Sequence, residues 1–357
     1  MSYPYLPPSL SQLLKEGTVI PAHPLALTKE RKLDERRQKL LTQYYIASGA
    51  GGVAVGVHTT QFEIRKPEIN LLEPVLRLAA EQIEESNLTT PFLKVAGIVG
   101  ATTQALREAE LAARYGYHLG LVSMGGLNDL RESELIKRLE AIAAIIPVFG
   151  FYLQPAVGGR LLSYDFWKDA ASIPNLSAIK VAAFNRYQTL DVVRAVCASN
   201  RHEEIALYTG NDDNIVADLL TAFRFTVNGN EVEKRFVGGL LGHWAVWTGA
   251  AVRLLNQIKS SGNDGLAIDE LLSTGVEVTD MNAAIFDPAN SFHGCIPGIH
   301  EILRRQGLLE GTWCLNPAEQ LSPGQLEEIN RVCMAYPHLT DDNDVKAFLE
   351  KTLSHQY

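Results

Sequence analysis

One lysine stands in the middle of a short apolar stretch of this sequence. The stretch covers residues 175–183 (Asn-Leu-Ser-Ala-Ile-Lys-Val-Ala-Ala), and Lys180 is its single charge. It is too short for a typical helix and follows Pro174, so it predicts a buried strand. Burial of an ammonium group is costly. Lys180 therefore either extends its amine to solvent at the end of the strand, or has a lowered pKa and acts as an amine nucleophile toward a carbonyl.

Other residues that suit carbonyl chemistry follow further short apolar runs. The phenol of Tyr152 is a candidate proton shuttle for the formation and collapse of a carbinolamine. Thr59 and Thr60 offer hydroxyl and backbone N–H groups to a carboxylate, and Gly238 and Gly239 would let a ligand approach the backbone closely. Each also has a structural interpretation. Tyr152 could be a core aromatic with a locally bonded hydroxyl, the threonines strand formers or a helix cap, and the glycines turn formers.

The elements that must position these residues alternate along residues 17–240. Eight short apolar runs predict strands, at 18–22, 52–57, 92–98, 119–123, 147–152, 175–183, 204–208 and 235–240. Residues at helical spacing separate the runs, for example Ile215, Leu219 and Phe223 after the seventh. Continuous apolar strands followed by helices imply a covered parallel sheet, and eight such units fit a (β/α)8 TIM barrel. A doubly wound sheet is the alternative, but no G-x-G-x-x-G follows the first strand.

The strand pattern ends near residue 243. Amphipathic helices are predicted beyond it, around residues 251–259, 269–272, 299–305 and 323–335. We therefore expect two parts: residues 1–243 as the barrel with a short N-terminal extension, and residues 244–357 as a C-terminal helical extension packed on it.

The composition of the chain argues against some classes of partner and indicates a cellular compartment. The 357 residues carry a net charge of −9 and no basic block, which argues against nucleic acid or an anionic membrane as a partner. The N-terminus has no apolar core of signal-peptide length, and no stretch approaches the roughly 20 apolar residues that span a bilayer. The four cysteines form no CxxC pair. We expect a cytoplasmic protein with reduced thiols and no cofactor.

Polar residues gather where the predicted strands end, which is the edge of a barrel that carries the chemistry. They are His23, His58, Thr59, Thr60, Tyr152, Lys180, Tyr208, Asp212 and His243, and the glycines Gly238 and Gly239 lie at the same edge. The three histidines, with Asp212 or Asp213, also raise the alternative of a metal site. Their spacing matches no compact metal motif.

Several of these pieces together resemble the dihydrodipicolinate synthase / N-acetylneuraminate lyase family of class I aldolases. The matching segments, in chain order, are residues 95–105 around a third strand, Tyr152-x-x-Pro155, Ile179-Lys180, Tyr208-x-Gly210-x-Asp212, and the C-terminal pieces at 282–286, 296–297 and 307–308. The resemblance implies a (β/α)8 barrel with a helical tail and a homo-oligomer, a dimer or tetramer. It implies a Schiff base between Lys180 and a 2-keto acid such as pyruvate. By position, it implies that Tyr152 relays protons and that Thr59 and Thr60 bind the carboxylate of the keto acid.

The sequence also departs from the family pattern. The turn G-T-T-G-E of the family stands here as His58-Thr59-Thr60-Gln61-Phe62, and Ser123-Met124-Gly125-Gly126 replaces a tyrosine pair. The arginine expected soon after Y-x-x-P is not at its usual offset, and Arg160 lies further along. We therefore expect a divergent lyase, aldolase or hydratase with Lys180 and Tyr152 as catalytic residues and Thr59, Thr60, Tyr208, Gly238 and Gly239 as substrate-binding residues. The alternatives are a metal-dependent lyase on the same barrel and a non-catalytic barrel that binds a keto acid.

Overall fold

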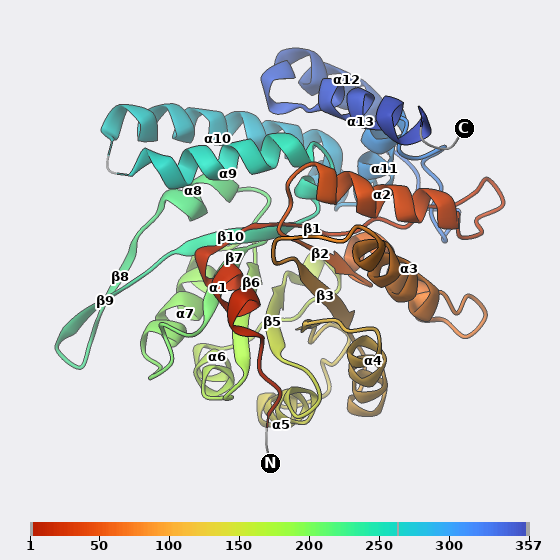
Figure 1. Ribbon diagram of the computed structural model, residues 1–357. Coiled ribbons are helices and arrows are strands. Elements are labelled where there is room, and N and C mark those ends of the chain that lie inside the picture. The colour runs from red at the N-terminus through yellow and green to blue at the C-terminus, as the bar shows by residue number, and fades with distance from the viewer. Residues whose placement is uncertain (1–2, 263, 355–357) are drawn as a thin grey trace. The chain divides into compact units, whose positions relative to one another are not determined.

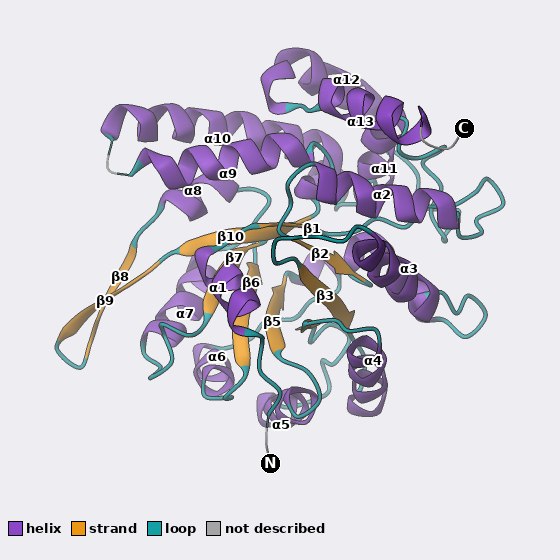
Figure 2. Cartoon of the chain, in the orientation of Figure 1, coloured by secondary structure: helices purple, strands orange, loops and turns teal. Residues whose placement is uncertain are grey.

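Eight parallel strands form one sheet in the computed structural model, which describes residues 3–262 and 264–354 (Figure 2). Their order is β1-β10-β7-β6-β5-β4-β3-β2, and a parallel bridge between Ala22 and Ala54, next to β1 and β2, closes the ring. The strands are β1 (Val19–Pro21), β2 (Gly52–Val55), β3 (Leu93–Ile98), β4 (Leu119–Val122), β5 (Val148–Leu153), β6 (Leu176–Ala182), β7 (Ala206–Thr209) and β10 (Phe236–Leu241). The predicted (β/α)8 barrel is confirmed.

The strands form where the sequence is continuously apolar, because both of their faces are covered. Every residue of β2, β4, β5 and β7 is buried. Parallel strands between a packed interior and a helical layer have no solvent face, so they do not alternate between apolar and polar residues. All eight predicted runs coincide with observed strands to within a few residues.

The described chain contains two compact units, and both are discontinuous in sequence. One consists of Met1–Thr18 and Pro91–Leu240, and the other of Val19–Thr90 and Leu241–Tyr357. The predicted boundary at residue 243 stays a prediction.

In the first unit, amphipathic helices follow β3, β4, β5 and β6 and lie outside these strands (Figure 1). The helices of this unit are α1 (Pro8–Glu16), α4 (Thr102–Arg114), α5 (Glu132–Ala143), α6 (Tyr164–Ala171), α7 (Arg186–Cys197) and α8 (Ile215–Leu220). Ser163 and Asn185 cap α6 and α7, since their side chains accept hydrogen bonds from backbone N–H groups of the first turn. These caps fix the residues at which α6 and α7 begin.

A two-stranded hairpin interrupts the barrel pattern between α8 and β10. It consists of antiparallel β8 (Phe223–Val227) and β9 (Asn230–Lys234), and it projects as a ribbon from its unit (Figure 2). Asn228 and Gly229 form its turn with positive φ angles of 51° and 82°, as a tight two-residue hairpin turn requires. The helical assignment of Phe223 is therefore wrong, because α8 ends at Leu220 and Phe223 begins β8.

The second unit is mostly helical. Besides β1 and β2 it holds α2 (Glu35–Ala47), α3 (Leu72–Glu85), α9 (Thr248–Ser261), α10 (Gly265–Phe286), α11 (Cys295–Arg305), α12 (Gln325–Ala335) and α13 (Asp342–Ser354). Helices α9 and α10 lie side by side (Figure 1). The buried carboxylate of Asp341 accepts hydrogen bonds from Tyr44 Oη at 2.7 Å, the Gly249 backbone N–H at 2.8 Å and Gln306 Nε2 at 2.9 Å. Within the described residues, no helix combines the length and apolar character needed to cross a bilayer.

Candidate active site

Lys180 lies in the second half of β6 and is buried, with 9% of its surface exposed. In the sheet it pairs with Phe151 of β5 on one side and with Tyr208 of β7 on the other. Its Nζ lies 4.5 Å from the centroid of the Phe151 ring, within the range of a cation–π contact. The sequence left open whether Lys180 reaches solvent, and the structure places it inside.

The surroundings of Lys180 favour its neutral amine. Burial lowers the pKa of Lys180 from 10.5 to about 8, because an ammonium group loses its hydration there. The negative charge of Asp212 acts in the opposite direction and raises the pKa. With this pKa about a tenth of the Lys180 amine is unprotonated at pH 7, far more than for an ordinary lysine, and the unprotonated form is the one that attacks a carbonyl.

Gly210, just after β7, leaves the space that the Lys180 side chain occupies. A Cβ atom at this position would lie 2.5 Å from Lys180 Cε and 2.9 Å from Ala182 Cβ. The Gly210 backbone N–H donates a hydrogen bond to Val181 O at 2.7 Å, which fixes the glycine against β6. The aliphatic stem of Lys180 therefore lies directly on the Gly210 backbone.

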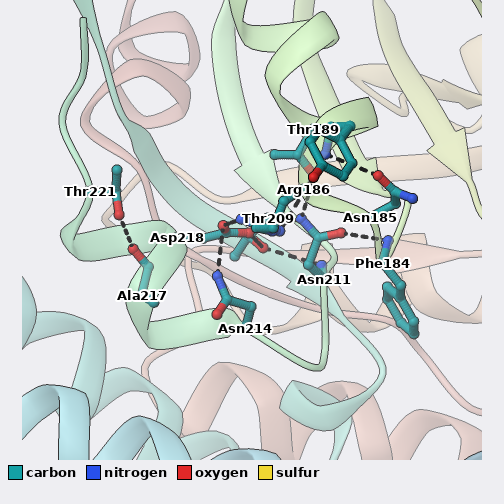
Figure 3. A network of polar contacts seen from close by, with 11 residues as sticks. Phe184, Asn185, Arg186, Thr189, Thr209, Asn211, Asn214, Ala217, Asp218 and Thr221 are labelled. Carbon is teal, nitrogen blue, oxygen red and sulfur yellow. Dashed lines mark hydrogen bonds and ion pairs between the residues drawn. The ribbon is translucent and has the colours of Figure 1, made fainter.

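A buried polar network fixes the segment that follows β7 (Figure 3). The fully buried carboxylate of Asp218 accepts hydrogen bonds from Thr209 Oγ1 at 2.7 Å and Asn211 Nδ2 at 2.9 Å, and it pairs with the Arg186 guanidinium. Asn211 Oδ1 in turn accepts a hydrogen bond from the Phe184 backbone N–H at 3.0 Å. Residues 209–214 are thereby anchored to α7, to α8 and to the segment after β6, which holds Asp212 in a defined place.

Tyr152 faces the helical layer, away from Lys180. Its ring packs on Trp167 of α6 with centroids 5.6 Å apart. Its hydroxyl donates to Leu162 O at 3.3 Å and accepts from the Leu162 backbone N–H at 3.2 Å, and burial raises the pKa of the phenol. The structure therefore does not bring together the two residues predicted to be catalytic.

A β-bulge explains this placement. Val148 pairs with Leu176, but the next residue, Phe149, pairs with Ala178, so Ser177 is skipped. Uninterrupted pairing from Val148 would have set Tyr152 opposite Lys180. The extra residue in β6 sets Phe151 there instead, and neighbours along a strand face opposite sides of the sheet.

Tyr208, Gly238 and Gly239, predicted to bind substrate, make structural contacts. The buried Tyr208 hydroxyl donates a hydrogen bond to Leu14 O of α1 at 3.0 Å, and burial raises the pKa of this phenol. A Cβ atom on Gly238 would lie 2.4 Å from Thr18 O and 2.9 Å from Tyr208 Cε1. The Gly239 backbone N–H donates to Thr18 O at 3.3 Å. Because the two glycines have no side chains, the backbone that follows α1 can pack directly on β10.

Thr59 and Thr60 belong to the second unit, in a short 3-10 turn (His58–Thr60) after β2. Thr59 Oγ1 donates to Ala22 O at 2.8 Å, and Thr60 Oγ1 donates to His23 O at 2.7 Å and accepts from the Gly56 N–H at 3.0 Å. Both hydroxyls are therefore engaged in holding this turn to the residues after β1. Their predicted role at a keto-acid carboxylate stays a prediction.

Among the described residues, His23, His58 and His243 do not form a metal cluster. His23 contacts Pro24 O through Nδ1 at 2.8 Å and Thr42 Oγ1 through Nε2 at 2.9 Å, so both ring nitrogens are engaged. Burial lowers the pKa of His23 and of His243 to about 4. Within residues 3–262 and 264–354, no three His, Cys, Asp or Glu side chains are grouped so that they could hold a metal ion.

Arg160, in the loop after β5, has a structural role. Its Nη1 donates to Leu127 O at 2.6 Å and to Leu130 O at 2.9 Å. Gly125, in the loop after β4, packs closely on Gly158, in the loop after β5. A Cβ atom on Gly125 would lie 2.4 Å from Gly158 O. The loops after β4 and β5 therefore hold each other, and the guanidinium of Arg160 is used in doing so.

A second lysine of this unit also has a lowered pKa. Burial brings the pKa of Lys234, at the end of β9, to about 8. Its Nζ donates a hydrogen bond to the His202 carbonyl oxygen. The Lys234 amine is thus held by a backbone carbonyl. Lys234 can therefore be compared with Lys180 as a lysine of similarly low pKa whose amine is hydrogen-bonded.

Comparisons with known proteins agree with this geometry at the level of the fold. No protein-family model and no curated protein sequence matches the chain. The chain is similar to solved structures of dihydrodipicolinate synthase from Oceanobacillus iheyensis (17% identity, TM-score 0.72, covering 92% of this chain and 99% of that one) and from Aquifex aeolicus (16%, 0.71, 91% and 99%). It is also similar to N-acetylneuraminate lyase from Fusobacterium nucleatum in complex with pyruvate (16%, 0.70, 91% and 99%). The chain therefore shares the barrel with C-terminal helices of the family that its motifs resemble.

Proposed function

We propose that this protein is a Schiff-base-forming lyase or aldolase, or a hydratase, that acts on pyruvate or another 2-keto acid through Lys180. One observation carries the proposal. A single lysine amine is buried in β6 over an aromatic ring, with its pKa lowered to about 8. The known lyases that share the fold, one of them solved with pyruvate, support the choice of chemistry.

The chemistry follows from the amine. The neutral Lys180 amine attacks the ketone carbon of the keto acid, and loss of water gives an iminium ion. The iminium withdraws electrons from the adjacent carbon, so it stabilises the carbanion that forms when a carbon–carbon bond breaks or a neighbouring proton leaves. The Phe151 ring lies 4.5 Å from Lys180 Nζ, where it would stabilise a positive charge on that nitrogen.

Reductive trapping tests the proposal. The protein is incubated with pyruvate, 2-oxobutanoate or a keto sugar acid and then with borohydride, and the adduct is located by peptide mass. We expect an adduct on Lys180 that is absent in Lys180→Met and unchanged in Lys234→Met, since Lys234 has a similarly low pKa but a bonded amine. Absence of any adduct at Lys180 across the keto-acid panel would reject the proposal.

A non-catalytic barrel that binds a keto acid is the second candidate. It is favoured by the internal hydrogen bonds of Tyr152, Thr59 and Thr60, which engage the hydroxyls predicted to act on substrate. Binding of pyruvate that persists unchanged in Lys180→Ala, measured by calorimetry, would select this candidate over the first.

A further inference from the structure

The hairpin of β8 and β9 is a separate two-stranded sheet that projects from its unit (Figure 2). Among the described residues, no further strand pairs with either of them, so each strand has one free edge. Helix α7 contacts both strands, and burial alternates along β8, so the helix covers a face of the hairpin and not an edge. A two-stranded hairpin alone is only marginally stable in water, whereas three or more strands with an apolar face form a stable sheet. The free edges therefore decide what can extend this sheet.

The register of the hairpin shows which backbone groups face outward. The residues that flank the two-residue turn form a hydrogen-bonded pair, and along an antiparallel pair of strands bonded and non-bonded pairs alternate. The next pair, Thr226 with Glu231, is therefore not hydrogen-bonded, and its N–H and carbonyl groups point away from the hairpin. The same holds for Arg224 with Glu233 two positions further on. Each edge of the hairpin thus offers outward N–H and carbonyl groups from two residues.

A second copy of β8 fits the outer edge of β8 across a two-fold axis. Antiparallel pairing centred on Phe225 sets Arg224 of each copy opposite Thr226 of the other. Each outward N–H then meets an outward carbonyl oxygen of the second copy, because these are the residues whose backbone groups are unused within the hairpin. Phe225 meets its own copy in a non-hydrogen-bonded pair, where side chains lie closest and an aromatic pair stabilises the sheet.

Side-chain charge distinguishes the two edges. The same two-fold pairing at β9 would set Glu231 of each copy opposite Glu233 of the other, and like charges directly opposite in a sheet are unfavourable. On β8 the facing side chains are Arg224 and Thr226, which do not repel each other. The charge of Arg224 is also balanced within its own hairpin, by Glu233 at 2.9 Å and by Glu231 at 3.9 Å. Natural edge strands avoid self-pairing through charge, proline or a bulge; β9 carries the charges, and β8 has a single charge, no proline and a regular register.

We propose that the outer edge of β8 binds a second copy of this chain, so that two hairpins form one continuous antiparallel sheet in the order β9-β8-β8-β9. The proposal does not depend on the chemistry of Lys180. Each copy contributes only a short hairpin, so the interface is smaller than a standard protein–protein interface. The dimer therefore dissociates on dilution.

Proline substitution at the two edges tests the proposal, with sedimentation velocity over a series of protein concentrations as the measurement. Proline is tolerated in an edge strand where its N–H would face solvent. Thr226→Pro removes an outward N–H of β8, and Glu231→Pro, at the residue paired with Thr226 in the hairpin, does the same on β9 as the matched control. We expect Thr226→Pro to raise the dimer dissociation constant about tenfold or more, since each copy loses a hydrogen bond. We expect Glu231→Pro to leave it within about twofold, because no bond of the interface is lost.

Charge at position 226 separates loss of pairing from loss of the hairpin, and it decides the matter if the proline variant does not fold. Thr226→Arg faces Arg224 of the second copy but Glu231 of its own hairpin, so it weakens the dimer while it suits the hairpin. Thr226→Glu has the opposite pair of effects. We expect the dissociation constant to rise about threefold or more in the first variant and to fall about threefold or more in the second. Changes in the same direction, or no change in either, would contradict the proposed register.

A disulfide locates the two-fold axis. In Phe225→Cys the new thiols of two copies face each other, so mild oxidation should give a covalent dimer. Val232→Cys, at the residue paired with Phe225 in the hairpin, is the control and should not exceed the background set by the four native cysteines. A protein that stays monomeric at every concentration overturns the proposal and leaves the β8 edge to a strand of a different protein. An assembly that Phe225→Cys does not crosslink and the Thr226 variants do not alter overturns it as well.

Discussion

At the scale of single residues, the burial of Lys180 lowers the stability of the native protein and makes its amine more reactive. A buried ammonium group lacks the hydration that it has in the unfolded chain, and the lowered pKa expresses that cost. Functional groups held in unfavourable surroundings commonly lower the stability of the protein that carries them.

Replacement of the lysine should therefore stabilise the fold. The native pKa near 8 lies below the ordinary value of 10.5, so below pH 8 both native and unfolded chains are protonated and the full cost is present. Between pH 8 and 10.5 only the unfolded chain holds the proton, and the cost fades as pH rises. We expect Lys180→Met to raise the free energy of unfolding by roughly 3 kcal/mol at pH 7, and by little at pH 10.5.

Urea denaturation at several pH values measures this effect. Lys168→Met, at an exposed position of α6, is the matched control and should change the unfolding free energy by less than about 0.5 kcal/mol at each pH. A Lys180→Met protein that is less stable than the unaltered one at pH 7 would contradict a destabilising buried ammonium.

A second prediction concerns Gly210. Its replacement by Ala puts a Cβ within 3 Å of Lys180 Cε and Ala182 Cβ, so the lysine stem must move. We expect Gly210→Ala to lose about 1–3 kcal/mol of stability and to form the pyruvate adduct at least about tenfold more slowly, since misplacement of a reacting atom is costly. Gly265→Ala, where a Cβ meets no atom within 4 Å, should leave both quantities unchanged; equal trapping rates for the two variants would count against the packing argument.

At the residue scale, the sequence indicates which residue types could do chemistry, but not the direction in which each side chain points. A lysine in an apolar strand allows either a buried amine or one that reaches solvent, and the structure shows Lys180 buried. The side of the sheet that Tyr152 faces depends on the bulge at Ser177, and no residue pattern in 175–183 marks an unpaired position. Asp212 belongs to the Y-x-G-x-D pattern, but the buried network that fixes the segment around it, after β7, has no signature in that pattern.

At the scale of elements, the strands could be predicted because strands that are buried on both faces have continuously apolar sequences. The sequence also contains a signal for the hairpin of β8 and β9. Asn228-Gly229, a common two-residue turn, lies between runs that alternate apolar and polar residues. It was overlooked because Ile215, Leu219 and Phe223 continue a helical spacing past the end of α8. Periodicity alone cannot locate a helix end without a cap or turn signal.

The buried network around Asp218 joins β7, α7 and α8, so substitution there affects several elements at once. Loss of its carboxylate in Asp218→Ala leaves Thr209 and Asn211 without their buried acceptor and Arg186 without its counter-ion. We expect a loss of about 3 kcal/mol of unfolding free energy, moderated because Arg186 is half exposed. We also expect slower pyruvate trapping, because residues 211–214 lose their anchor.

Denaturation in urea checks the stability change, and Asp191→Ala is the control. Asp191 pairs with Arg194 on the exposed surface of α7 at 3.0 Å, a pair worth less than about 1 kcal/mol. Similar losses for the two variants would mean that the buried network contributes no more than a surface ion pair.

At the scale of the whole molecule, covalent capture of a keto acid should stabilise the native chain. Binding to the native state alone adds about 2.7 kcal/mol when the ligand is at 100 times its dissociation constant. For a chain of 357 residues this corresponds to a rise in Tm of roughly 4 °C. We expect calorimetry to show this rise with pyruvate for the unaltered protein and its loss in Lys180→Met; an equal rise in both would favour reversible binding without an imine.

The bond between the Tyr208 hydroxyl and Leu14 O also has a consequence for biosynthesis. Its partners are 194 residues apart in the chain, and α1 is made long before the strand that receives it. At the usual elongation rate of about 5–20 residues per second, α1 waits roughly 10–40 s for β7 to be synthesised. During that interval the hydrogen bond between Tyr208 and Leu14 cannot form. The segment of α1 therefore takes up its native contact with β7 only after more than half of the chain has been made.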